Sequence, residues 1–173
     1  MLTHGFNMHR VYLSAPGDLD KEKDICREAI SQVNGSDAMK DKILLVSLGL
    51  REDGMIEQVR GPVTDNVRQC SYFVQVFEDD WGPKNLMRKV FYTACDLRAD
   101  ETLPMRQVVV FLKDAPRETD PEILAFRKEL ADLPDVPVYS FQTADQLRQK
   151  LSEIATEWVK QIRETEPIPQ PTA

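Results

Sequence analysis

The chain has 173 residues, which suits one domain of ordinary size with a core of its own. Its 29 acidic and 22 basic residues give a net charge of −7, and this argues against a nucleic-acid-binding protein, because phosphate backbones require clustered positive charge. The three cysteines are widely spaced and form no CxxC pair, so we expect neither a zinc site nor a redox dithiol but a reduced, cytoplasmic protein.

The first third of the chain predicts a strand, a helix and a second strand. Residues 11–14 are a short β-type run, and a helix to about Val33 follows, with Asp18 or Asp20 as its N-cap. Residues 43–48 form a nearly continuous apolar run, which is typical of a strand covered on both faces.

The middle of the chain repeats this alternation. A short helix with Val63 and Val67 on its inner side leads to a third strand at residues 72–77. The acidic turn 78–83 breaks that strand, and a helix is predicted over residues 85–99 with a clear apolar face.

The last third of the chain predicts two more strands, each followed by a helix. Residues 108–112 are an apolar strand, and a modestly amphipathic helix begins at Pro121. A weaker strand at 136–140 contains Pro137, which suits an edge position, and a strong amphipathic helix over about 147–162 follows it.

Five strands alternating with five helices predict a three-layer α/β protein with a mostly parallel, five-stranded sheet in the flavodoxin-like order 2-1-3-4-5. We expect residues 1–165 to form this single domain. The proline-rich residues 166–173 are then a tail or the stump of a linker, because they cannot stay helical.

Several classes of site are missing from the sequence. The glycines form no GxGxxG pattern, and the P-loop spacing of Gly49 and Gly54 is followed by Met55 and Ile56 instead of lysine and a hydroxyl residue. No apolar run approaches the ~18 residues that a membrane span requires, and the first ten residues lack the apolar core of a secretion signal. We therefore expect no membrane partner and no Rossmann-type cofactor site.

In a sheet of this order, ligands bind beyond the carboxyl ends of the strands, beside the point where the strand order reverses. This places the loops at 14–18 and 78–82 side by side, with residues 51–53 next to them. The whole site prediction depends on that adjacency.

The first loop leads into a helix N-terminus, where backbone amides favour an anion. Ser14 and Gly17 would let a phosphate or ribose approach, whereas Asp18 would oppose a phosphate. The alternative is a tight turn with an N-cap, which uses the same residue types. Arg51 is a further candidate for a phosphate contact, or else the partner of the neighbouring acids in a surface ion pair.

The second loop holds three consecutive acids, Glu78, Asp79 and Asp80. Crowded carboxylates raise one another's pKa and are candidates for acid or base catalysis or for binding ribose hydroxyls; the alternative is a solvated loop. Trp81 would stack on a base or nicotinamide ring, or cover the edge of the core. No metal site is predicted.

Other chemistry-bearing residues are given structural roles. His4 and His9 precede the first predicted strand without a metalloprotease or triad motif, so we expect ordinary surface residues. The cysteines, including Cys70 just before the third strand, are expected to be structural, and Trp158 fits the apolar register of the last helix.

Three segments resemble a family of TIR-like domains, often described only as domains of unknown function, that commonly precede NACHT-type or other STAND ATPase modules. Residues 10–30 (RVYLSAPGDLDKEKDICREAI) are similar to the family's opening block, and the match there is fairly specific. Residues 70–82 (CSYFVQVFEDDWG) and 103–113 (LPMRQVVVFLK) resemble its third and fourth strands. The resemblance covers roughly residues 10–115.

The resemblance implies a fold related to TIR domains and nucleoside 2-deoxyribosyltransferases. Enzymes among those relatives cleave N-glycosidic bonds of NAD or nucleosides with a glutamate on the helix after the third strand. Here residues 85–97 contain no glutamate, and Ser71 and Tyr72 stand where an assisting aspartate is expected. Both departures count against a working glycosidase.

Two functions follow as hypotheses. The first is a TIR-like signalling or interaction domain with little or no catalytic activity, which acts with a regulatory ATPase module or by self-association and requires no cofactor. The alternative is an N-glycosidase or 2-deoxyribosyltransferase-like enzyme acting on NAD or a nucleoside, with Glu78, Asp79 or Asp80 as nucleophile or base and residues 14–18 holding the ligand. A phosphoacceptor like that of receiver domains is disfavoured, because no acid pair follows the first strand.

Overall fold

The computed structural model describes residues 5–16, 18–49, 63–81 and 85–166. The strands are β1 (Asn7–Ser14), β2 (Ile43–Leu48), β3 (Tyr72–Phe77), β4 (Gln107–Lys113) and β5 (Val138–Phe141). The α-helices are α1 (Asp20–Val33), α2 (Val63–Arg68), α3 (Leu86–Ala99), α4 (Pro121–Ala131) and α5 (Ala144–Thr165). The predicted alternation of strands and helices is confirmed.

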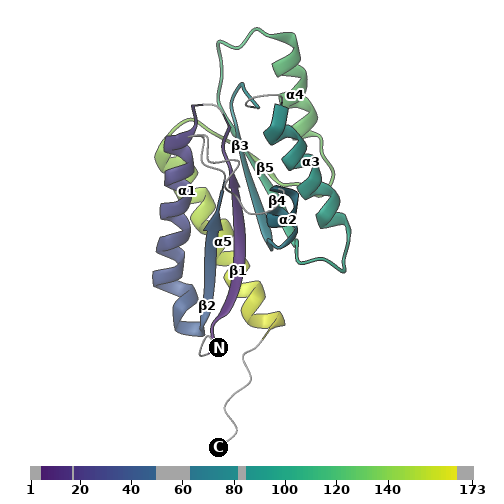
Figure 1. The fold of residues 1–173 in the computed structure, drawn as a ribbon. Helices are drawn as coiled ribbons and strands as arrows, with labels where there is room; N and C mark the ends of the chain where they lie inside the picture. The colour runs from purple at the N-terminus through teal and green to yellow at the C-terminus, as the bar shows by residue number, and fades with distance from the viewer. Residues whose placement is uncertain (1–4, 17, 50–62, 82–84, 167–173) are drawn as a thin grey trace, which may run out of the picture.

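The five strands form one sheet in the order β2-β1-β3-β4-β5, and every neighbouring pair is parallel. This confirms the predicted fold and strand order. Because the strands are parallel, all five begin at one edge of the sheet, here called the amino edge, and end at the other, the carboxyl rim (Figure 1). At the carboxyl rim, Ser14 of β1 lies beside Gln75 of β3.

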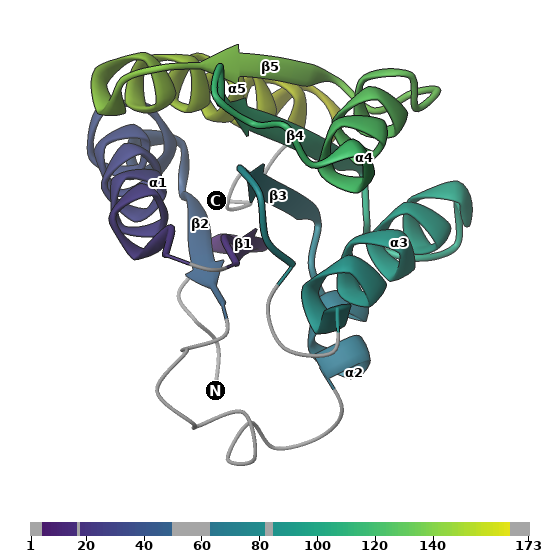
Figure 2. The ribbon, with the colours of Figure 1, turned by 90° about the horizontal axis from the view of Figure 1, so that it is seen from above.

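Helices cover both faces of the sheet, as Figure 2 shows, with α1 and α5 on one face and α2, α3 and α4 on the other. Successive side chains of a strand point to opposite faces, so each strand feeds two cores. Val11 and Leu13 join the core under α1 and α5, whereas Tyr12 joins the core under α2 and α3. Trp158 of α5 is buried and stacks on Tyr72 with ring centroids 4.1 Å apart, which confirms its core position.

α1 ends at Val33, as predicted, but its N-terminus differs from the prediction. The N-cap is Leu19, with no side-chain hydrogen bond, so the expected capping by Asp18 or Asp20 is wrong. The chain continues past Val33 as a π-helical turn, Asn34–Ala38, and a 3₁₀ turn, Met39–Asp41. The chain leaves this segment at Lys42, whose φ of 56° lies in the left-handed region.

The two last helices begin at side-chain caps. Asp120 accepts a hydrogen bond from the backbone N–H of Glu122, ahead of Pro121 in the first turn. Thr143 and Gln146 form a capping box at the start of α5, in which each side chain accepts from the other's backbone N–H. No helix in the described residues combines the length and the apolar character needed to cross a bilayer.

Candidate functional site

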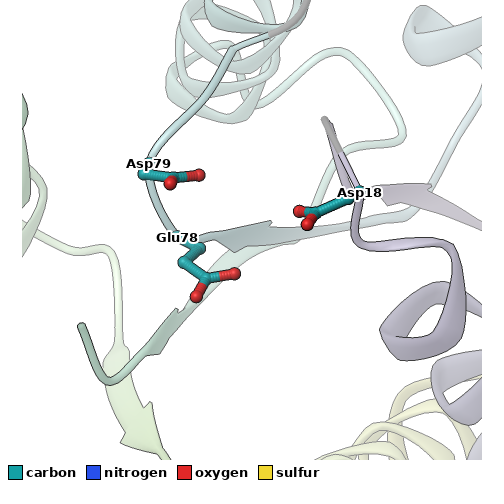
Figure 3. Close-up of side chains that lie close together, drawn as sticks. All are labelled: Asp18, Glu78 and Asp79. Carbon is teal, nitrogen blue, oxygen red and sulfur yellow. The ribbon is translucent and has the colours of Figure 1, made fainter.

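The carboxyl rim brings the two predicted loops together. β1 ends at Ser14 and its parallel neighbour β3 ends at Phe77, so the turn before α1 and the turn after β3 leave the sheet side by side. Each of Asp18, Glu78 and Asp79 offers a carboxylate oxygen, and these three oxygens all lie within 4.8 Å of one another (Figure 3). We call these three residues the acidic cluster. The predicted adjacency of the two loops is confirmed.

The acidic cluster is open to solvent. Asp18 and Asp79 are exposed and Glu78 is half-buried. Partial burial raises the pKa of the Asp79 carboxyl, and the negative charges of Asp18, Glu118 and Asp80 raise it further. Three carboxylates therefore lie close together at the rim. Among the described residues, no side chains cover them from solvent.

One cation partly balances this charge. The Nζ of Lys113, at the end of β4, lies 2.9 Å from Oε1 of Glu22 and 3.6 Å from Oε2 of Glu78. The hydrogen bond to Glu22 raises the pKa of Lys113 most, and the charge of Glu78 adds to the effect, while partial burial opposes it. Lys113 thus stays protonated and links α1 to the turn after β3.

Arg127 of α4 fixes the ends of β3 and β4 from the other side. Its guanidinium donates to the backbone carbonyls of Glu78, at 2.9 Å, and Lys113, at 2.7 Å. The sequence predicts only a modestly amphipathic helix here and gives Arg127 no role. An arginine inside an otherwise apolar stripe is the signal that marks it, because such a side chain needs acceptors.

Two buried polar side chains lie beneath the rim. Ser14 is 1% exposed and Gln75 is fully buried. The Gln75 amide donates to the backbone carbonyls of Ser14, at 3.3 Å, and Val76, at 3.0 Å. Within the described residues, neither the Ser14 Oγ nor the Gln75 Oε1 has a hydrogen-bond partner. Buried groups of this kind can accept or donate to a ligand hydroxyl, and the glutamine inside an apolar strand was the signal for Gln75.

Carboxylate oxygens are the ligands that Mg²⁺ and Ca²⁺ take in proteins, so the acidic cluster has the chemistry for a hard cation. Exposed acidic groups are also common without one. The open geometry gives no further reason to assign a metal, and none was predicted.

The remaining predicted site residues are placed as follows. Trp81 is 4% exposed and packs against Phe77, Phe91 and Phe126, with centroids 4.4, 6.1 and 5.7 Å away. Of the two predicted roles, the Trp81 ring therefore has the second: it covers the edge of the core. It has no accessible face on which a ligand ring could stack. Asp80 is exposed and lies outside the acidic cluster. Gly17 and Arg51 lie outside the described residues.

One prediction at the amino edge is wrong. His9 is a β1 residue only 6% exposed, not a surface residue of the lead-in, because β1 begins four residues earlier than predicted. Glu166, the first residue of the predicted tail, forms hydrogen bonds with Asn7, His9 and Arg106. Local periodicity gives no signal for either contact, since the partners are far apart in the chain.

The structural interpretation of Cys26 and Cys70 is supported by burial. Both are buried, and desolvation raises the pKa of Cys26 to about 12 and that of Cys70 to about 11. Their thiols stay protonated near neutral pH and are poor nucleophiles.

Two cavities lined by described residues lie away from the acidic cluster. One of about 580 Å³ opens at the amino edge beside His9, Ser71 and Arg106. The other, of about 620 Å³, lies along β5 and the start of α5.

No protein-family model matches the chain, and no curated protein matches it in sequence. The fold and rim define a doubly wound parallel α/β protein with a solvent-open acidic cluster at its topological switch point.

Proposed function

We propose that the chain is a TIR-like signalling or interaction domain without strong catalytic activity at its carboxyl rim. The observation that supports this most is the openness of the acidic cluster: the carboxylates of Asp18 and Asp79 face solvent, and Glu78 shares Lys113 with Glu22. Enzymatic cleavage of a glycosidic bond uses two carboxyl groups held at a fixed separation on either side of the scissile bond of a bound sugar.

The helix after β3 adds to this argument. α3 (Leu86–Ala99) contains no glutamate, so the nucleophile that the related enzymes place on this helix has no counterpart here. Without it, an oxocarbenium-like transition state loses its stabilising carboxylate on that side. The interaction role itself is supported by the resemblance of residues 10–30 and 70–82 to TIR-like domains that accompany regulatory ATPases.

The decisive experiment incubates the 173-residue chain with NAD, nucleosides and nucleotides and follows free base by chromatography. We expect no base release above the protein-free blank, and rapid release from any of these substrates would overturn the proposal.

Sedimentation velocity over a concentration series tests the interaction role, with concentration-dependent self-association as the supporting result. A strict monomer that also fails to bind a purified STAND ATPase module would contradict it.

The alternative is an N-glycosidase or 2-deoxyribosyltransferase-like enzyme that binds NAD or a nucleoside at the same rim. Crowding in the acidic cluster favours it, because the raised pKa of Asp79 suits a group that exchanges protons. The Ser14 hydroxyl and the Gln75 amide oxygen are buried beneath the same rim and have no hydrogen-bond partner among the described residues.

If base release is found, variants identify the groups responsible. Glu78→Gln and Asp79→Asn should each lower the rate by about 100-fold or more if either carboxylate is an acid, base or nucleophile. Asp80→Asn tests the third candidate acid, which lies outside the acidic cluster. Glu157→Gln removes an exposed acid of α5 and is the control. Unchanged rates in Glu78→Gln, Asp79→Asn and Asp80→Asn would remove the acids from the mechanism.

A further inference from the structure

The amino edge of the sheet, opposite the rim discussed above, holds a second polar constellation. His9 lies in β1, Ser71 stands directly before β3, and Glu166 follows the last turn of α5. The backbone N–H of Ser71 donates to the carbonyl of Arg10 at 2.9 Å, which fixes Ser71 against β1. In Figure 1 the end of α5 lies at the same end of the molecule as the start of β1.

The three side chains form a continuous hydrogen-bonded chain. The Nε2 of His9 lies 3.1 Å from Oε2 of Glu166, and the Nδ1 lies 2.8 Å from Oγ of Ser71. A carboxylate only accepts, so Nε2 carries the proton in the neutral ring. Nδ1 then presents its lone pair, and the Ser71 hydroxyl donates to it. This is the arrangement that activates a serine, with the two ring nitrogens exchanged relative to a serine-protease triad.

The charges around the imidazole keep it in the form that accepts a proton. Burial lowers the pKa of His9, the positive charge of Arg106 lowers it further, and Glu166 opposes both. The other groups that face the ring are the Ser71 hydroxyl and the Tyr72 ring, whose centroid lies 6.3 Å away. His9 is therefore mainly neutral near pH 7.

Glu166 is itself held in place. The Asn7 amide donates to its Oε2 at 2.8 Å, and the Arg106 guanidinium donates to its Oε1. Burial raises the pKa of Glu166, but the hydrogen bond from Asn7 and the charges of Arg106 and His9 outweigh this and leave it below its ordinary value. The carboxylate stays ionised and orients the imidazole.

The chain of hydrogen bonds borders the cavity of about 580 Å³, a volume within the range of small-molecule sites. Leu103, Pro104 and Met105 contribute an apolar wall. Arg98 also lines the cavity, and the described residues give it no ion-pair partner. Glu101 and Arg106 line the cavity as well. An apolar wall and a cation in the cavity that Ser71 borders suit a short acyl group whose carbonyl oxygen becomes negative.

We propose that Ser71, His9 and Glu166 form an acyl-transfer site, in which Ser71 attacks small carboxylic esters. The Ser71 Oγ forms a bond to the carbonyl carbon while its proton passes to Nδ1 of His9. The ester C–O bond then breaks, and the departing alkoxide takes that proton. Water repeats the sequence on the acyl-serine and regenerates Ser71, so ester and water become acid and alcohol. Arg98 stabilises the oxyanion, and Glu166 is a positioning residue.

The test treats the 173-residue chain with a small alkyl fluorophosphonate, which forms a P–O bond to an activated serine with loss of fluoride. Intact-mass measurement and peptide mapping should find one adduct, on Ser71. A small chromogenic acetate ester should give a burst of alcohol equal to the protein concentration. Ser71→Ala should abolish both, and Ser140→Ala, which removes an exposed serine of β5, should change neither.

His9→Asn keeps an acceptor near the Nδ1 position but cannot take the proton, so labelling should slow by about 100-fold or more. Glu166→Gln should slow labelling and move its pH midpoint downward, because the carboxylate that raises the pKa of His9 is lost. A merely structural role for Glu166 would leave the midpoint unchanged. Circular dichroism establishes that each variant is folded.

The wild-type protein alone can overturn the proposal. Folded chain with no adduct on Ser71, or with adducts only on other residues, contradicts it. Labelling of Ser71 at an unchanged rate in folded His9→Asn would remove the general base. None of these outcomes bears on the proposed function, whose residues lie at the opposite edge of the sheet.

Discussion

Among single residues, Asp79 has the least favourable electrostatic surroundings at the carboxyl rim, because three other carboxylates lie near it. Its carboxyl is largely exposed, yet its pKa is raised by partial burial and by Asp18, Glu118 and Asp80. A raised carboxyl pKa in the folded state means that ionisation at neutral pH opposes folding. The charge of Asp79 therefore costs the folded protein stability near neutral pH.

Asp79→Asn should therefore stabilise the protein near pH 7. We expect a gain of about 0.2–1 kcal/mol in the free energy of unfolding, the range for exposed charges, measured by urea denaturation. Glu157→Gln removes an exposed charge from the middle of α5 and is the control. A loss of stability in Asp79→Asn would show that the carboxylate has a favourable partner instead.

His9 and Glu166 give the protein a stability that depends on pH. Both have folded-state pKa values below their ordinary values of 6.5 and 4.5, so both bind protons more readily when unfolded. Each group adds fully to the free energy of unfolding at pH values above its ordinary pKa. That contribution is lost as the pH falls through the lower pKa of the folded state.

The free energy of unfolding should accordingly decrease as the pH is lowered through 6.5 and again through 4.5. Urea denaturation at a series of pH values measures this, and His9→Asn should flatten the upper part of the curve. An equally steep curve in folded His9→Asn would assign the pH dependence to other groups.

At the scale of elements, the helix starts depend on short motifs that the apolar periodicity does not reveal. α5 begins at Thr143, whose hydroxyl accepts from the backbone N–H of Gln146 at 3.2 Å. The Gln146 side chain in turn accepts from the N–H groups of Thr143 and Gln142, at 3.2 and 2.7 Å. This box turns the chain directly from β5 into the helix.

Thr143→Ala should cost about 1 kcal/mol of unfolding free energy, because helix amides lose their acceptor. Thr156→Ala is the matched control, since Thr156 is an exposed threonine inside the same helix whose hydroxyl donates to the Ser152 carbonyl. Thermal and urea denaturation compare the two variants. If both substitutions lower the free energy of unfolding equally, the capping box contributes no more than an exposed threonine inside the helix.

Across the whole molecule, burial is greatest in the centre of the sheet. β3 has a strand on each side and all six of its residues are buried. β5 pairs with β4 alone and only Phe141 among its residues is buried. Local opening requires few contacts to be broken at such an edge strand.

Hydrogen exchange measured by NMR should follow this order. Amides of β3 should exchange only through global unfolding, whereas those of β5 should exchange through local opening with a smaller free energy. Protection in β5 equal to that in β3 would mean that the edge strand belongs to the same cooperative unit as the centre.

The alternation of strands and helices, the parallel sheet and its strand order could be predicted from the sequence. These follow from patterns that are local: apolar runs such as 72–77 and 108–112 alternate with amphipathic helices, and right-handed crossovers leave few ways to connect them. Once the order is known, the adjacency of the loops that carry Asp18, Glu78 and Asp79 follows from geometry, whereas the approach of their carboxylates is seen only in the structure.

The sequence could not predict which polar and aromatic side chains are enclosed. Trp81 is covered by Phe91 and Phe126 from two helices, and His9 meets Ser71 and Glu166, which lie 62 and 157 residues further along the chain. Such contacts depend on how the elements pack and not on the periodicity of any one segment. A single-sequence pattern reports which face of an element is apolar, but not which distant side chain will lie against it.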